Sequence, residues 1–62
     1  MNRIKELREK KGLTQQQLAN LAGVTQPYLH DLEKGHRGAK PETWARIALA
    51  LGVLVSELKE AG

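Results

Sequence analysis

The sequence predicts an all-α fold built from four or five short helices. Three observations lead to this prediction. The apolar residues are mostly leucine and alanine, with ten Leu and seven Ala among the 62 residues, and few are β-branched or aromatic. Apolar side chains recur three and four positions apart in several segments, which is the spacing of one helical face. Glycines separate these segments, and no alternation of apolar and polar residues indicates a strand.

Length and composition restrict the class of protein. A chain of 62 residues is expected to form one domain, residues 1–62. It has no cysteine, which excludes disulfides and thiolate metal sites and fits a reducing, cytoplasmic compartment. No apolar run approaches the ~20 residues that span a bilayer, and the charged N-terminal segment does not have the pattern of a secretory signal. We therefore expect no membrane partner.

The first two helices are predicted from their spacing and their ends. Residues 2–12 place Ile4, Leu7, Arg8 and Lys11 on one helical face. Gly12 ends that helix because glycine tolerates a left-handed backbone. Thr14 and Gln17 have the spacing of a capping box, so a second helix is expected from about Thr14 to residue 22. Its apolar stripe is expected to contain Leu18, Leu21 and Ala22.

The third helix has clear signals at both ends. Gly23 breaks the second helix, and Thr25 can cap the next one. Pro27 falls in the first turn, where a missing N–H has no cost, so it marks the start of a helix. Gly35 ends this helix, and residues 36–40 are expected to form a loop.

Two more helices are predicted toward the C-terminus. Pro41 can open a fourth helix, which Gly52 ends. The apolar face of this helix carries Trp44, Ile47, Ala48 and Leu51. A short final helix is expected within residues 54–62, with Val55 and Leu58 as its apolar positions.

The join between the second and third helices has a specific pattern. Gly23 permits a sharp turn, and Val24 can fill the angle between the two helices. Ala19 is small enough to let the third helix cross closely. The seam is completed by Leu18, Ala22, Leu29 and Leu32. Two helices that pack at a steep angle across a three-residue turn need this arrangement.

At these residues the sequence resembles the Cro/cI-type helix-turn-helix family, also called the xenobiotic-response-element (XRE) family. The matching run is GLTQ…LA…AGVTQ…L..LE.G, followed by ETWARIALALGV, and the resemblance covers roughly residues 4–58. It implies a lambda-repressor-like bundle of five short helices with the motif at about residues 15–34. It also implies a transcriptional repressor that binds double-stranded operator DNA as a homodimer, with residues 26–34 in the major groove. No enzymatic activity, cofactor or metal is expected.

The resemblance places the DNA contacts on the exposed face of the third helix, opposite Leu29 and Leu32. Gln26 matches a base-contacting position and can pair with adenine N6 and N7, and Asp31 can accept from cytosine N4. Gln15 matches a phosphate-contacting position, where the helix N-terminus adds its dipole. Tyr28 and Arg37 are further phosphate candidates. The predicted DNA-binding residues are Gln15, Thr25, Gln26, Pro27, Tyr28, His30, Asp31, Lys34 and Arg37.

The chain departs from the family pattern at three positions. Pro27 stands where relatives often carry a polar residue, so we expect only apolar contact there. Leu54 stands where Ser or Thr usually caps the last helix, so that helix starts elsewhere or frays. Leu49 occupies a position that is usually polar. With Val53, Leu54 and Val55 it forms either an apolar patch for a partner or part of the core.

Charged residues raise two further expectations. Arg8 and Glu33 lie beside apolar stripes, where charges are normally paired, and matching residues in relatives join the first and third helices. We therefore expect Arg8 and Glu33 to form a structural ion pair. The net charge of +3 is concentrated in residues 1–13 and 36–40. These cations are either a solvated surface or a footprint for a polyanion.

The sequence leaves two alternatives to DNA binding. An enzyme or metal site would have to use His30, His36 and Asp31, whose spacing is not that of a known ligand set. A protein-interaction module is the stronger competitor, because a helical bundle with an apolar face can bind a protein, as the antitoxin of a toxin pair does. The two functions are compatible, since antitoxins of this family also bind DNA.

Overall fold

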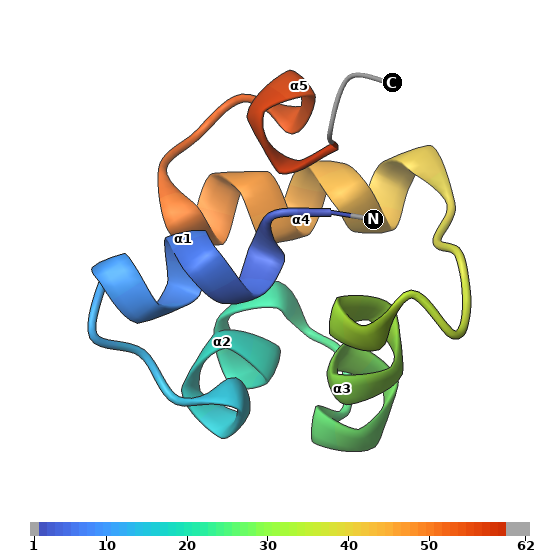
Figure 1. Ribbon diagram of the computed structural model, residues 1–62, viewed down its shortest axis with the longest axis horizontal. Coiled ribbons are helices and arrows are strands. Elements are labelled where there is room, and N and C mark those ends of the chain that lie inside the picture. The colour runs from blue at the N-terminus through green and yellow to red at the C-terminus, as the bar shows by residue number, and fades with distance from the viewer. Residues whose placement is uncertain (1, 60–62) are drawn as a thin grey trace.

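The computed structural model describes residues 2–59, which form five helices (Figure 1). The helices are α1 (Ile4–Lys10), α2 (Gln15–Ala22), α3 (Gln26–Lys34), α4 (Pro41–Leu51) and α5 (Val55–Leu58). In Figure 1, α4 and α5 lie in the upper half with α1 in front of α4, and α2 and α3 lie below them. Helix α2 packs against both α3 and α4, and α4 packs against α5. The predicted all-α, lambda-repressor-like fold is confirmed.

All five helices contribute to the hydrophobic core. The buried apolar residues are Ile4, Leu18, Ala19, Ala22, Leu29, Leu32, Trp44, Ile47, Ala48, Leu51 and Leu58. Around the core, half-buried apolar side chains such as Leu7, Leu13 and Val24 close its edges. A core of this size suits a short chain, because small domains bury a modest share of their surface.

Two positions differ from the predicted helical faces. Leu21 is 62% exposed, so its assignment to the apolar stripe of the second helix is wrong. At about 100° per residue, Leu18, Ala19 and Ala22 face the same side of α2, and Leu21 falls on its flank. Lys11 is exposed and is the C-cap of α1, which ends at Lys10.

The N-termini of α2 and α3 carry the caps that the sequence predicts. The Gln17 backbone N–H donates to Thr14 Oγ1 at 3.0 Å, and the Thr14 N–H donates to Gln17 Oε1 at 2.9 Å. In α3, the Tyr28 N–H donates to Thr25 Oγ1 at 3.3 Å. These bonds satisfy backbone donors that have no partner within the helix, and so they fix where each helix begins.

The last helix begins with Leu54 at the N-cap, so the expectation that it starts elsewhere is wrong, and it is shorter than predicted. Leu54 is its N-cap and has no side-chain acceptor, so the Glu57 carboxylate alone serves this end, accepting from the Leu54 N–H at 2.7 Å. Helix α5 ends at Leu58. The rest of the predicted helix, residues 60–62, lies outside the described residues.

The two ends of the described chain are joined by backbone hydrogen bonding. Asn2 and Lys59 form an isolated antiparallel bridge, and the Arg3 N–H donates to the Leu58 carbonyl at 2.8 Å. The Asn2 side chain also donates to the Leu32 carbonyl at 2.8 Å and accepts from the Ile4 N–H at 3.1 Å. These contacts connect the start of α1 to the last turn of α3 and to α5.

None of the helices in residues 2–59 is long and apolar enough to cross a membrane.

Candidate nucleic-acid interface

The turn between α2 and α3 sets the angle at which α3 is presented. Gly23 caps α2 with φ of 73°, a left-handed conformation that side chains disfavour. The Val24 N–H donates to the Ala19 carbonyl at 3.0 Å, which closes the end of α2. Val24 itself is half-buried and packs against the core. Ala19 is completely buried, and its small side chain allows the close approach.

Helix α3 has one buried and one solvent-facing side. Leu29 and Leu32 are fully buried, as the sequence predicts. The predicted contact residues are more accessible: Thr25, Pro27, His30, Lys34 and Arg37 are exposed, and Gln15, Gln26, Tyr28 and Asp31 are half-buried. Apolar burial on one side therefore leaves a row of polar groups on the other.

A hydrogen-bond network joins the N-termini of α2 and α3. Gln26 Nε2 donates to Gln15 Oε1 at 2.7 Å. Gln15 Nε2 donates to Glu33 Oε1 at 3.0 Å and lies 3.4 Å from His30 Nδ1. The sequence predicts Gln15 and Gln26 as separate DNA contacts and does not indicate the hydrogen bond between them. Each begins its helix, but their meeting depends on the crossing of the two helices.

Both N–H groups of the Gln15 amide therefore point toward protein acceptors. In this arrangement the amide presents an oxygen lone pair, which cannot bind a phosphate oxygen, so the predicted phosphate contact of the Gln15 side chain stays a prediction that requires this network to open. At this position the donor left for a phosphate is the backbone N–H at the first turn of α2, where the helix dipole also attracts an anion. The Gln15 side chain is better placed to position Gln26.

Arg8 and Glu33 are brought together beneath this network. Arg8 Nε donates to Glu33 Oε2 at 2.8 Å, and Arg8 Nη2 donates to Glu33 Oε1 at 3.2 Å. Arg8 Nη1 donates to the Leu13 carbonyl at 2.8 Å. The two side chains are only 10% and 3% exposed. One guanidinium thus ties together α1, the turn that follows it, and α3.

The remaining predicted contact residues lie along α3 and in the loop that follows it. The Arg37 guanidinium stacks on the Tyr28 ring, 4.6 Å from its centre, so the structure pairs these two phosphate candidates. Lys34 is exposed in the last turn of α3. Within residues 2–59, the Asp31 carboxylate has no hydrogen bond or ion pair, which leaves it available to an external donor.

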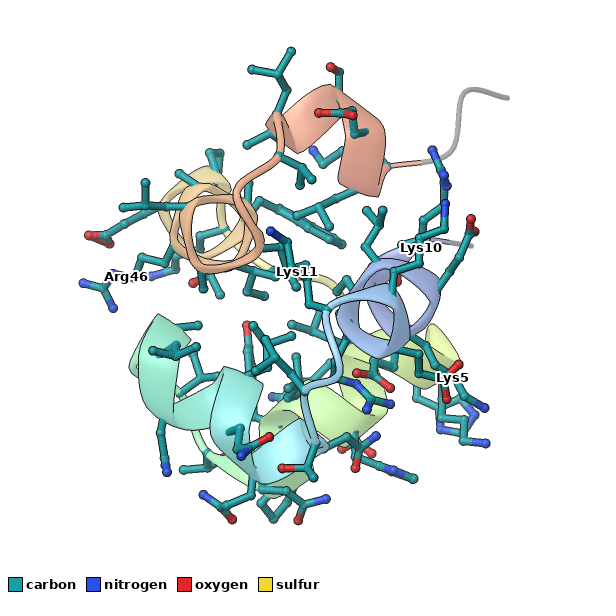
Figure 2. The ribbon with its side chains drawn as sticks, turned by 90° about the vertical axis from the view of Figure 1, so that its left-hand side faces the viewer. Lys5, Lys10, Lys11 and Arg46 are labelled. Atoms are coloured by element: carbon teal, nitrogen blue, oxygen red, sulfur yellow. The ribbon has the colours of Figure 1, made fainter. Side chains whose placement is uncertain are left out.

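The cations of the N-terminal segment do not form one cluster. Arg3 pairs with Glu6 at 3.1 Å, and Arg8 is used internally. Figure 2 shows the labelled cations spread across the view, with Arg46 on the left, Lys11 near the centre, and Lys10 and Lys5 on the right. This distribution favours a solvated surface for α1 over a concentrated anion footprint.

The suggested metal ligands do not assemble. Among the residues that the structure describes, no three His, Asp or Glu side chains gather in a way that could hold a metal ion. His30 is instead engaged with Gln15.

The apolar positions near the end of α4 divide into two kinds. Val53 and Val55 are half-buried and pack against the core. Leu49 and Leu54 are 82% and 69% exposed. Leu49 and the exposed Leu21 line a shallow hollow between α2 and α4, together with Asn20, Ala22, Gly23, Arg46 and Ala50. The two valines therefore close the core, and the leucines face solvent.

Known proteins with similar sequence and structure share this architecture. A family model described as Helix-turn-helix matches residues 4–58. The HTH-type transcriptional regulator DdrOP3 of Deinococcus deserti is 38% identical over 58 residues, covering 94% of this chain and 45% of the relative. The immunity repressor protein of Bacillus phage phi105 is 39% identical over 56 residues, covering 90% of this chain and 39% of the phage protein. The chain thus spans less than half of each regulator.

A solved structure agrees over most of its length. The restriction-modification controller protein C.AhdI from Aeromonas hydrophila matches with a TM-score of 0.86 and 36% sequence identity. The match covers 89% of this chain and 83% of that one.

Proposed function

Because the chain belongs to the helix-turn-helix family, we propose that it binds double-stranded operator DNA in a sequence-specific manner and represses transcription, without catalysing a reaction. The observation that carries this proposal is the outer face of α3. Gln26, His30 and Asp31 follow one another along that face, while Leu29 and Leu32 anchor the helix in the core. An α-helix fits the major groove of B-DNA, where base edges differ in their donors and acceptors.

The contacts divide into base reading and backbone anchoring. Gln26 retains one N–H, which can donate to adenine N7, and its carbonyl oxygen, which can accept from the adenine N6 amino group. Asp31 can accept from cytosine N4, and Pro27 can make apolar contact with a thymine methyl group. Arg37 and Lys34 anchor the backbone, together with the first turn of α2.

Repression is supported by the relatives. The phage protein is named as an immunity repressor, and the bacterial relative as a transcriptional regulator. A domain that occupies the major groove at a promoter excludes other proteins from the same site. Repression therefore needs no activity beyond binding.

We also propose that the chain acts as a homodimer. Leu49, Leu54 and Leu21 are large apolar side chains that face solvent, and contiguous exposed apolar groups, such as Leu49 and Leu21 in one hollow, commonly mark interaction sites. A two-fold dimer would place two copies of α3 in successive major grooves, with half-sites about 10 base pairs apart.

Titration of labelled duplexes at two salt concentrations tests the proposed function. A duplex selected from a random library should bind more tightly than a mixed-sequence duplex. Affinity for both should fall as salt rises, because counterions are released from the phosphates. Absence of any preferred duplex, or a flat salt response, would contradict the proposal.

A further inference from the structure

The buried ion pair determines the direction of the hydrogen bonds at the start of α3. Arg8 holds both carboxylate oxygens of Glu33, so this carboxylate can only accept. Glu33 Oε1 accepts from Gln15 Nε2 at 3.0 Å. The Gln15 amide is thereby fixed with its nitrogen toward Glu33 and its oxygen toward Gln26, which donates to it at 2.7 Å.

This orientation also determines which nitrogen of His30 carries the proton. Gln15 Nε2 lies 3.4 Å from His30 Nδ1, and an amide nitrogen can only donate. His30 Nδ1 must therefore accept, and in the neutral imidazole the proton resides on Nε2. Within residues 2–59, Nε2 has no hydrogen-bond partner. It lies across the ring from Gln15, on an exposed side chain.

We propose that His30 reads a guanine of the operator by donating from Nε2 to N7, an inference that rests on the proposed DNA-binding function. His30 is one helical turn after Gln26, so both lie on the face of α3 that would enter the groove. The two residues also share Gln15 as a partner, which holds them in a common arrangement.

Guanine is the base that suits a single donor. Its major-groove edge presents two acceptors and no donor, whereas adenine places an amino group beside N7. Thymine offers one acceptor next to a methyl group, and cytosine offers a donor. A donor on His30 without an adjacent acceptor would leave the adenine amino group unpaired, which is unfavourable.

The test uses a duplex selected from a random library and a set of analogues in which each guanine in turn is replaced by 7-deazaguanine. This base lacks the N7 acceptor but still pairs normally. At one guanine in each half-site, the replacement should weaken wild-type binding by about three- to tenfold, as expected for one hydrogen bond. His30→Asn can still accept from Gln15 but has no donor at the position of Nε2, so it should be insensitive to the same replacement.

Two controls test whether the effect belongs to His30 and whether its proton is on Nε2. His36→Ala changes the other histidine, in the loop after α3, and should keep the wild-type sensitivity. A long-range proton–nitrogen NMR spectrum of the free protein should show His30 protonated at Nε2.

Protonation at Nδ1 instead, wild-type binding that no 7-deazaguanine weakens, or an effect that persists in His30→Asn at every guanine where the wild type shows one, would overturn the assignment. If no duplex is preferred at all, the proposed function fails first. If a duplex is preferred but His30→Asn behaves like wild type, only the role of His30 is wrong.

Discussion

The Arg8 guanidinium donates to both carboxylate oxygens of Glu33, at 2.8 and 3.2 Å, and links α1 to α3 through a nearly inaccessible ion pair. Removing one partner of such a pair leaves an uncompensated buried charge, which costs ~3–5 kcal/mol. A small domain has a total stability of only about 5 kcal/mol or somewhat more. We therefore expect Glu33→Ala to be largely unfolded near room temperature, as measured by thermal denaturation.

Glu42→Ala is the matched control for this variant. Glu42 pairs with Arg46 at 3.5 Å, but both side chains are more than half exposed. Exposed pairs contribute about 1 kcal/mol or less. Equal melting temperatures for Glu33→Ala and Glu42→Ala would show that the buried pair does not stabilise the fold.

Gln26 and Arg37 should have different effects on DNA binding. Gln26→Ala removes a base-reading amide and should cost about 1–3 kcal/mol on the preferred duplex, with relaxed preference at one base position. Arg37→Ala removes a phosphate contact and should weaken all duplexes alike, lowering the salt slope by about one. Binding curves on the preferred duplex and on random duplex distinguish the two. Equal loss on both duplexes for Gln26→Ala would mean that α3 does not read bases.

The exposed leucines predict how the protein self-associates. Leu49→Gln and Leu54→Gln should each weaken dimerisation without unfolding the monomer, because both side chains face solvent and neither belongs to the core. Sedimentation velocity across a range of concentrations measures the association. Lys5→Gln, an exposed change on α1, serves as the control. If the wild type is monomeric throughout and binds a single half-site as tightly as a full site, the dimer is wrong.

Stability should depend on pH through Glu6. The Arg3 side chain hydrogen-bonds to Glu6, and this bond, followed by the charge of Arg3, lowers the pKa of Glu6 below its usual value. The resulting stabilisation is present above the unfolded pKa of about 4.3 and is lost as pH falls through the lower folded pKa. Glu6→Gln should therefore lower the melting temperature slightly at neutral pH and have no such effect in strong acid.

Glu9→Gln, on an exposed residue of the same helix, controls for the loss of charge. A Glu6→Gln effect that stays constant from neutral pH into strong acid would exclude ionisation of Glu6 as its cause.

Helix ends were predictable because they depend on local chemistry. Thr14, Thr25 and Gly23 each act through atoms within a few positions of themselves, so the caps and the turn could be predicted from the chain alone. Leu21 was misassigned because the buried face of α2 extends from Leu18 and Ala22 toward Ala19, on the flank opposite Leu21, and choosing between the two flanks requires the direction of the neighbouring helices.

The candidate site was predictable only as a set of residues. The spacing and the family resemblance indicated which side chains belong to it. The contact between Gln15 and Gln26 depends on how two helices cross, and the stacking of Arg37 on Tyr28 depends on the path of the loop. These are tertiary relationships that no local pattern specifies.

The pairing of residues 3 and 58 has a consequence for how quickly the folded state is lost. Bringing together groups so far apart in the chain has a loop-closure cost, whereas the contacts within helices and across their turns are local. The pairing should therefore form after the rate-limiting step of folding. The adjacent Asn2 side chain makes a similarly long-range bond, to the Leu32 carbonyl, so we expect Asn2→Ala to accelerate unfolding and leave the refolding rate nearly unchanged in stopped-flow measurements. The contacts that join the two ends of the chain therefore slow unfolding, and so lengthen the lifetime of the native state, without speeding its formation.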